Sequence, residues 1–263
     1  MTLQGVVLDL DGTVYHGEHP LPGAAAAVDR VRDRGLSLCF FSNNPLYDGE
    51  RYVERLQGMG VDARPGEACS SAVVTRDYVD DQHAGDGVFV IGSDPLRETI
   101  RETRADVLTQ PSAADVLLTS WTDGFGYRDM VDALRAFDDG TAFLGTDPDP
   151  TFQDSDGNLV PGSGAITRAV SGVIERDPDR VLGKPSDVAV DAAVDILDCD
   201  PAESLVVGDR LETDIRLGER AGMQTALVMS GVTDEATLER SDVAPDYVID
   251  SLSEIDGVLD SLA

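Results

Sequence analysis

The sequence predicts an α/β protein with a doubly wound parallel sheet, into which a second α/β unit is inserted. Short runs rich in Val and Leu alternate with amphipathic stretches along most of the chain. Strands of a parallel sheet covered on both faces read as continuous apolar runs of this kind. Polar residues follow several of these runs, and 263 residues are enough for one large domain or two of ordinary size.

The first third of the chain reads as strands and helices in turn. GVVLDL is a continuous apolar run that ends in carboxylates, and an alanine-rich amphipathic stretch follows it and closes at Gly35. The predicted elements here are strands at 5–10 and 36–43 and helices at 24–35, 46–58 and 70–82.

The rest of the chain repeats this alternation around one Gly, Pro and Asp-rich loop at 147–164. The middle third predicts strands at 88–92, 114–121 and 141–147, helices at 95–105 and 127–140, and a helix ending near 175. The final third predicts strands at 180–183, 204–209, 224–231 and 246–252 and helices at 187–197 and 212–222.

The charge of the chain is strongly negative, because fifty Asp plus Glu face twenty Lys plus Arg, for a net charge of −30 and a pI near 4.1. Nucleic acid is therefore an unfavourable partner. At molar salt the Debye length is only about 3 Å, which screens the self-repulsion of so acidic a chain. The charge, with a single lysine, Lys184, indicates a halophilic protein; an acidic mesophilic protein is the alternative.

Neither a disulfide framework nor a membrane segment is predicted. Cys39, Cys69 and Cys199 are widely spaced and form no CxxC pair, so we expect reduced thiols and no zinc site. The N-terminus has no basic region followed by an apolar core, and no run of 18 apolar residues occurs. We expect a soluble, cytoplasmic protein.

Polar side chains stand at the ends of four predicted strands. In a doubly wound sheet, ligands bind beyond the carboxyl ends of the strands. Each segment alone is explained as a turn or a helix cap. Together they supply carboxylates for Mg²⁺, an Asp nucleophile, a hydroxyl and one ammonium, as metal-assisted phosphoryl transfer requires. The residues are Asp9, Asp11, Ser42, Asn43, Lys184, Asp209 and Asp214.

These segments, DLDGTVY, FFSNN, GKPS and GDRLETD in this order, resemble the four motifs of the haloacid dehalogenase superfamily. With HPLPGA and GTDPDPTF, the chain is similar to the NagD-like phosphatases of that superfamily. The resemblance covers most of the chain and is weakest between 84 and 140. It implies a Rossmann-like core that hydrolyses phosphate monoesters of small metabolites.

The resemblance also implies a role for each motif residue. Asp9 would be the nucleophile that forms an aspartyl-phosphate, and Asp11 the general acid and base. Ser42 would hydrogen-bond the phosphoryl oxygens, Asn43 would position this loop, and Lys184 would pair with Asp9 and the phosphoryl group.

The cofactor implied by the resemblance is Mg²⁺. Asp9, Asp209 and the backbone carbonyl of Asp11 would bind it directly, and Asp214 would act through water or in the surrounding shell. Since lysine carries a compact charge and arginine a broad planar fork, a crowded site explains why the lone lysine is kept at 184.

The spacing of the motifs locates the inserted cap. Asp11 and Ser42 are only 31 positions apart (42 − 11), which one helix and one strand fill, whereas Asn43 and Lys184 are 141 positions apart. We therefore predict a core at 1–83 and 181–263 and an α/β cap at 84–180.

Within the cap, the loop 145–164 is the candidate for the segment that faces the substrate, with Asp147 as its candidate substrate residue. A flexible acidic hairpin is the alternative for this loop. Trp121 and Phe125 could line a pocket, although packing in the core or at a contact between domains is the favoured interpretation. For His16 and His19, exposed loop positions are favoured over a metal site.

The sequence thus predicts a Mg²⁺-dependent phosphatase of small phosphate esters. A non-catalytic protein that binds a phosphorylated ligand, and a phosphotransferase to an acceptor other than water, are the alternatives. Whether two copies associate through the cap is left open.

Overall fold

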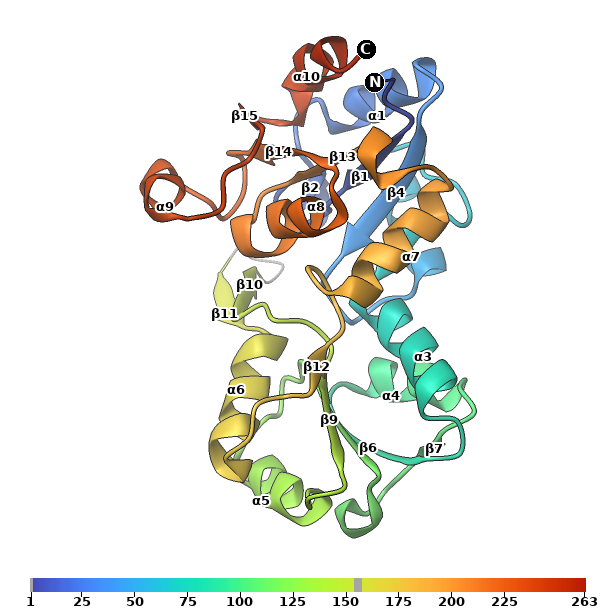
Figure 1. The fold of residues 1–263 in the computed structure, drawn as a ribbon, viewed down its shortest axis with the longest axis vertical. Helices are drawn as coiled ribbons and strands as arrows, with labels where there is room; N and C mark the ends of the chain where they lie inside the picture. The colour runs from blue at the N-terminus through green and yellow to red at the C-terminus, as the bar shows by residue number, and fades with distance from the viewer. Residues whose placement is uncertain (1, 154–157) are drawn as a thin grey trace.

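The computed structural model describes residues 2–153 and 158–263 and contains two parallel sheets. In the described part of the chain, the larger sheet has six strands in the order β15-β14-β13-β1-β4-β5. The smaller has five in the order β12-β9-β8-β6-β7. Figure 1 shows the larger sheet in the upper part of the molecule, near both termini, and the smaller sheet in the lower part. The predicted α/β fold class is confirmed.

The strands of the larger sheet are β1 (Gly5–Leu8), β4 (Ser37–Ser42), β5 (Ala68–Ser70), β13 (Ser204–Gly208), β14 (Gln224–Val228) and β15 (Tyr247–Ile249). Those of the smaller sheet are β6 (Gly87–Ile91), β7 (Asp106–Val107), β8 (Val116–Thr119), β9 (Ala142–Gly145) and β12 (Arg180–Val181). Two antiparallel pairs accompany them, β2 (Tyr15–His16) with β3 (His19–Pro20), and β10 (Thr151–Gln153) with β11 (Leu159–Pro161).

The helices are α1 (Ala24–Asp33), α2 (Gly49–Gly58), α3 (Ser71–Gln82), α4 (Asp94–Arg101), α5 (Tyr127–Ala136), α6 (Ser163–Ile174), α7 (Asp187–Leu197), α8 (Arg216–Ala221), α9 (Glu235–Arg240) and α10 (Ile255–Ser261). A π-helical turn, η3 (Leu211–Ile215), precedes α8. Short 3₁₀ turns lie at η1 (Pro111–Ala113), η2 (Pro201–Glu203) and η4 (Leu252–Glu254).

Alternate residues of β1 pack on opposite faces of the larger sheet, as the two-residue period of a strand requires. Val6 and Leu8 join the apolar cluster formed with α1, α2 and α10. Val7 joins a second cluster, formed with α3, α7 and α8. Buried on both faces, β1 is the central strand that the apolar run GVVL predicts.

The second cluster continues into the smaller sheet. Besides Val7, it contains Val88 of β6, Leu118 of β8 and Leu96 of α4. On the other face of the smaller sheet, α5 and α6 cover Phe143 and its neighbours. The two sheets are therefore packed together through the layer that contains α3.

One predicted strand lies in the other sheet. Residues 180–183 were expected to return the chain to the core, but β12 (Arg180–Val181) pairs with β9 at the edge of the smaller sheet. Arg180 and Val181 pair with β9, and this two-residue strand forms the edge of the smaller sheet. The division of the chain at 83/84 and 180/181 stays a prediction.

The loop 147–164 contains the antiparallel pair β10 and β11, where a hairpin was the alternative interpretation, and its residues 154–157 lie outside the described residues. Strand β5 precedes α3, where the sequence predicts helix from residue 70. No helix in the described part of the chain has the length and apolar character needed to cross a membrane.

Candidate active site

The four strand-end segments meet at one edge of the larger sheet. Leu8 of β1 lies level with Phe40 of β4 and with Val207 of β13. The residues at or just after the ends of these three strands are therefore neighbours, and they include Asp9, Ser42 and Asp209. Strand β1 lies between β4, which follows it in the chain, and β13, which comes much later. The strand order therefore reverses at β1, and α/β sheets bind ligands beyond the carboxyl ends of the strands at such a switch point.

Lys184 lies at the centre of the site, and its side chain is only 1% exposed. The Nζ atom donates to Asp9 Oδ1 at 2.7 Å, to Asp214 Oδ1 at 2.6 Å and to the carbonyl oxygen of Phe41 at 2.7 Å. All three ammonium hydrogens thus have an acceptor. Burial lowers the pKa of Lys184, but Asp214 and Asp9 outweigh it and hold the pKa above its ordinary value.

The position of Lys184 corrects the sequence interpretation of its segment. It was expected after a strand of the core, whereas it follows β12 of the smaller sheet. The chain then turns at once into α7, because the Oγ of Ser186 accepts the backbone N–H of Ala189 and begins that helix. Lys184 therefore lies where the chain passes from β12 of the smaller sheet to α7, which packs on the larger sheet.

Asp9 and Asp214 contact this ammonium group, and Asp209 lies beside these two carboxylates. One carboxylate oxygen from each of Asp9, Asp209 and Asp214 lies within 4.8 Å of the others. Burial raises the pKa of Asp9, with repulsion from Asp214, while Lys184 opposes the rise. Burial likewise raises the pKa of Asp209 to about 7, again with repulsion from Asp214. Three acidic groups and one lysine leave a local excess of negative charge.

A divalent cation fits this arrangement. Asp209 Oδ2 accepts the backbone N–H of Val232 at 2.6 Å, but its Oδ1 is buried and has no hydrogen-bond partner among the described residues. A Cβ on Gly12 would stand 2.5 Å from Oδ2, and one on Gly231 only 2.0 Å, so two glycines leave room for this carboxylate. Oxygen ligands of this kind suit Mg²⁺.

Asp11 and Asp214 differ from the other two carboxylates. Asp214 Oδ2 accepts the backbone N–H of Arg210 at 3.1 Å, so both of its oxygens already have donors. The side chain of Asp11 is 36% exposed, and its Oδ1 lies 3.5 Å from His16 Nδ1. Burial raises the pKa of Asp11, and His16 opposes the rise. The Asp11 carboxyl group therefore faces the pocket and lies outside the acidic group of three.

Ser42 and Asn43 have different partners. Ser42 Oγ accepts the backbone N–H of Asn44 at 3.1 Å and the hydroxyl of Tyr52 at 3.2 Å. The side-chain amide of Asn43 pairs with the peptide groups of Lys184, with Oδ1 accepting its N–H at 2.8 Å and Nδ2 donating to its carbonyl at 3.1 Å. Asn43 thus holds the backbone that carries the lysine.

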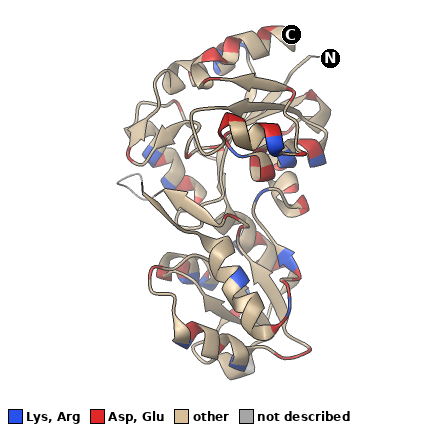
Figure 2. Ribbon diagram, turned by 90° about the vertical axis from the view of Figure 1, so that its left-hand side faces the viewer, with Lys and Arg blue, Asp and Glu red and all other residues tan. Residues whose placement is uncertain are grey.

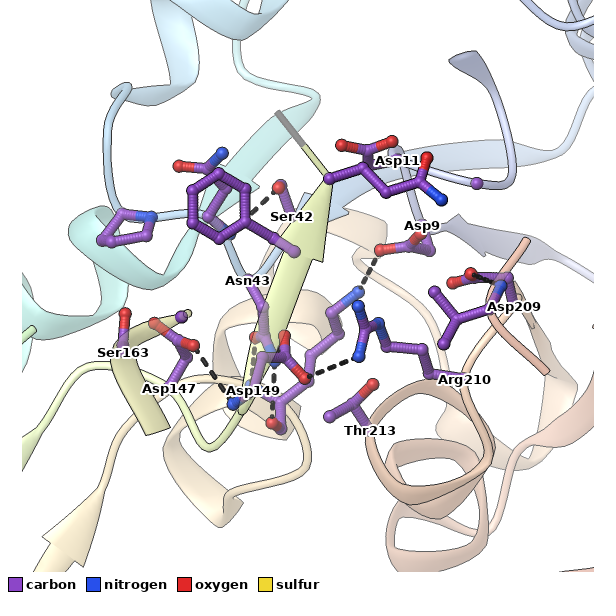
Figure 3. Close-up of a pocket in the computed structure, with 18 of the residues that line it drawn as sticks. Asp9, Asp11, Ser42, Asn43, Asp147, Asp149, Ser163, Asp209, Arg210 and Thr213 are labelled. Atoms are coloured by element: carbon purple, nitrogen blue, oxygen red, sulfur yellow. Dashed lines mark hydrogen bonds and ion pairs between the residues drawn. The ribbon is translucent and has the colours of Figure 1, made fainter. Parts of the chain in front are cut away.

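A pocket opens beside Asp9. One wall comes from the strand-end segments of the larger sheet, and the facing wall comes from the second unit, through Trp121, Asp147, Phe152 and others. The rings of Trp121 and Phe152 meet edge to face, with 5.6 Å between their centroids. Figure 3 shows carboxylates of both walls pointing toward the same space.

Asp147 lies in this pocket wall and is 2% exposed. Its Oδ2 accepts the hydroxyl of Thr146 at 3.0 Å, and its Oδ1 accepts the backbone N–H of Asp149 at 3.2 Å. Burial, with repulsion from Asp149, raises the pKa of Asp147 to about 8. At neutral pH this candidate substrate residue therefore carries a proton and can donate a hydrogen bond.

Asp147→Asn is expected to raise the free energy of unfolding, and to raise it more at pH 9 than at pH 5. Below about pH 4 the carboxyl group is protonated in both states; as pH rises toward 8 the unfolded chain loses the proton while the folded protein keeps it, so the wild type loses stability. Asn stays neutral, and its Nδ2 can donate to Thr146, whose hydroxyl also bonds Ser120 at 2.9 Å.

Urea unfolding between pH 5 and pH 9 measures this gain, which we expect to reach roughly 2 to 4 kcal/mol. Asp139→Asn, the same change at an exposed position, is the control and should show no such trend. A gain from Asp147→Asn that does not vary with pH would contradict the assignment of the raised pKa.

The structure also bears on the histidine and aromatic predictions. His16 is not an exposed loop residue; it lies in β2, lines the pocket and places Nε2 3.0 Å from the carbonyl oxygen of Ser230. Trp121 lines the pocket, whereas Phe125 packs against the apolar cluster beneath α5. His19 is exposed, as expected.

Two charged residues of the pocket were missed, Asp149 and Arg210. Arg210 stands inside the motif GDRLETD, directly after Asp209, so its position was a usable signal. Asp149 lies in an acidic, proline-rich loop where nothing in the pattern separates it from its neighbours.

Comparison with known proteins agrees with this geometry. Two models of one superfamily match the chain, "Haloacid dehalogenase-like hydrolase" over residues 6–105 and a HAD-hydrolase-like model over 181–255. The acid sugar phosphatase of Staphylococcus haemolyticus is 32% identical over 250 residues, which cover 95% of this chain and 94% of that protein. The chain belongs to the haloacid dehalogenase-like hydrolases.

Solved structures of other haloacid dehalogenase-like hydrolases have the same fold. The p-nitrophenyl phosphatase from Archaeoglobus fulgidus superposes with a TM-score of 0.90 at 30% identity, covering 98% of this chain and 100% of that one. NagD from Escherichia coli superposes with a TM-score of 0.85 at 28% identity, covering 97% and 99%. The prediction of a hydrolase of this superfamily is confirmed, and its predicted class, a phosphoric monoester hydrolase, agrees with the names of these relatives.

Proposed function

We propose that this haloacid dehalogenase-like hydrolase is a Mg²⁺-dependent phosphatase that hydrolyses small phosphate monoesters through an aspartyl-phosphate. The observation that supports it most is the contact of Lys184 Nζ with both Asp9 and Asp214, on the floor of a pocket that also presents Asp11. The proposed substrates are small phosphate monoesters: esters of the p-nitrophenyl phosphate type, phosphoglycolate, sugar phosphates or pyridoxal phosphate.

In the first step a carboxylate oxygen of Asp9 attacks the phosphorus atom, and the bond from phosphorus to the ester oxygen breaks. The Asp11 carboxyl group gives its proton to the leaving oxygen. Lys184, which already touches Asp9, stabilises the negative charge of the transferring group, and the Ser42 hydroxyl can donate to it.

In the second step Asp11, now ionised, takes a proton from the water that attacks the aspartyl-phosphate. Phosphate leaves, and the Asp9 carboxylate is restored. Asp9, Asp209 and the backbone carbonyl of Asp11 would hold Mg²⁺, with Asp214 in support; when bound, the ion supplies positive charge to the phosphoryl oxygens.

We further propose that residues 84–180 form the cap of this enzyme and that Asp147 contacts the leaving group. The pocket walls, with Asp9 on one side and Trp121, Asp147 and Phe152 on the other, support this division. A salt-rich cytoplasm as the site of action, and association of two copies through the cap, stay predictions. Figure 2 shows acidic residues over both parts of the molecule, in agreement with its net charge of −30.

The test is release of p-nitrophenol from p-nitrophenyl phosphate at high KCl concentration, with Mg²⁺ and with EDTA. Removal of the metal is expected to lower turnover by at least about 100-fold, because charge stabilisation by a bound ion is worth several kcal/mol. Asp209→Asn should cause a similar loss even with Mg²⁺, since it weakens the ligand whose Oδ1 has no other partner among the described residues.

A second readout does not depend on turnover. Mg²⁺ should raise the melting temperature of the wild type and raise that of Asp209→Asn much less, because a ligand that binds only the folded state stabilises it. Equal turnover with Mg²⁺ and with EDTA, in a fully stripped protein, would overturn the metal-dependent mechanism.

A further inference from the structure

Asp149 joins the wall of the pocket formed by the second unit to two segments of the facing wall. Its carboxylate, on a side chain 16% exposed, lies between Asn43, whose Nδ2 donates to Oδ2 at 3.1 Å, and Arg210, whose Nη1 lies 3.7 Å from Oδ1. The Nη2 of Arg210 also donates to the carbonyl oxygen of Thr151 at 3.0 Å. Figure 3 shows Asp149 between the two side chains.

The backbone of Asp149 is fixed from its own side of the pocket. Its N–H donates to Asp147 Oδ1 at 3.2 Å, and its carbonyl oxygen accepts the N–H of Gly164, in the first turn of α6, at 2.9 Å. A Cβ on Gly162 would stand 2.5 Å from the same oxygen, so the chain passes very close here. The carboxylate therefore projects from a held peptide.

The contact with Asp149 adds to the two Lys184 contacts in favouring one orientation of the Asn43 amide. Asn43 Nδ2 has two hydrogens and two acceptors, Asp149 Oδ2 and the carbonyl oxygen of Lys184, while Oδ1 accepts the Lys184 N–H. A reversed amide would turn Oδ1 toward a carboxylate and a carbonyl, and Nδ2 toward an N–H. Asp149 therefore favours the one orientation that pairs with the Lys184 peptide.

We propose that Asp149 is a positioning residue for the hydrolysis: it helps to orient the Asn43 amide, which holds the Lys184 peptide and so places the lysine ammonium group beside Asp9. The proposal rests on the proposed function of this site. Asp149 acts through Asn43 and does not touch the reacting atoms. Its second contact ties Arg210, and with it the segment after Asp209, to the wall of the pocket that faces the substrate.

The test compares Asp149→Ala, Asn43→Ala and the double variant, each assayed with p-nitrophenyl phosphate and Mg²⁺. Asp149→Ala is expected to lower kcat by about 10- to 100-fold with KM changed less than about threefold, because a small displacement of Lys184 misplaces a transition-state contact. In the Asn43→Ala background, Asp149→Ala should lower kcat by less than about threefold, because the contact between Asp149 and Lys184 through Asn43 is already lost.

Hydrogen exchange of the Lys184 backbone amide is a readout that needs no turnover. Asp149→Ala should speed this exchange, and should not speed it further once Asn43 is replaced. If the wild type fails to hydrolyse p-nitrophenyl phosphate, the proposed function fails, while the exchange rates still decide whether Asp149 holds this peptide. If Asp149→Ala does not fold, Asp149→Asn, which keeps an acceptor for Asn43, replaces it and should keep kcat within about fivefold of the wild type.

The control is Asp123→Ala, the same change at an exposed position of the same unit, which should leave kcat and exchange unaltered. The proposal is overturned if exchange at Lys184 does not change in Asp149→Ala, if its kcat stays within twofold of the wild type, or if the effects of Asp149→Ala and Asn43→Ala simply multiply.

Discussion

Asp9→Asn is expected to lower the hydrolysis of p-nitrophenyl phosphate by at least about 10⁴-fold, because an amide cannot attack phosphorus as a carboxylate does. The substitution keeps the size of the side chain. Asn keeps an oxygen that can accept from Lys184 Nζ, and the other two acceptors, Asp214 and the Phe41 carbonyl oxygen, are unchanged, so the fold should persist. The substitution also removes one of three clustered carboxylates, which should make the apoprotein no less stable than the wild type.

Two measurements check this expectation. Steady-state turnover gives the loss, and mass spectrometry after rapid acid quenching should find a phosphoryl group on Asp9 in the wild type and none in the variant. Asp177→Asn makes the same change at an exposed position and should retain full turnover. Residual activity above about 1% in a homogeneous sample of Asp9→Asn would exclude Asp9 as the nucleophile.

Lys184→Arg is expected to lower kcat by about 10² to 10³-fold although the positive charge is kept. The ammonium donates in three directions, to Asp9, Asp214 and the Phe41 carbonyl oxygen, from a position that is 1% exposed. A guanidinium is planar and wider, and its fork suits two parallel acceptors better than three converging ones. The variant should therefore fold with its charge displaced from Asp9.

Lys184→Met separates the charge from the geometry. It leaves Asp9 and Asp214 without their cation, and breaking a buried ion pair costs about 3 to 5 kcal/mol of stability. Urea unfolding should thus show a large loss for the Met variant and a smaller one for the Arg variant, while both lose turnover. Near-normal kcat in Lys184→Arg would show that charge alone suffices.

The parts of the site that follow apolar strands could be predicted from the sequence, because strand ends fix both position and direction. Asp9 and Asp209 follow β1 and β13, and parallel pairing makes them neighbours whatever the intervening chain does. Lys184 was also expected at the site, although the strand before it belongs to the other sheet. The motif predicted the position of the lysine, but the two-residue strand before it is too short for its sequence to show which sheet it joins.

The residues that depend on contacts between the two units could not be predicted in this way. Asp149 is 106 positions from Asn43, and only packing of the smaller sheet against the larger one brings them together. His16 was placed in solvent because a short hairpin, which folds it back toward Ser230, has no hydrophobic period to reveal it. Local patterns describe elements, whereas these contacts depend on how the elements are arranged.

The apolar cluster that runs from Val7 through α3 to Val88 and Leu118 has a consequence for the insertion as a whole. The second unit does not have a separate hydrophobic core on this side, because its apolar residues form one cluster with those on one face of the larger sheet. A chain shortened by removing it would leave α3 with an uncovered apolar side and would lose part of its own core. Unfolding is therefore expected to be cooperative across both units.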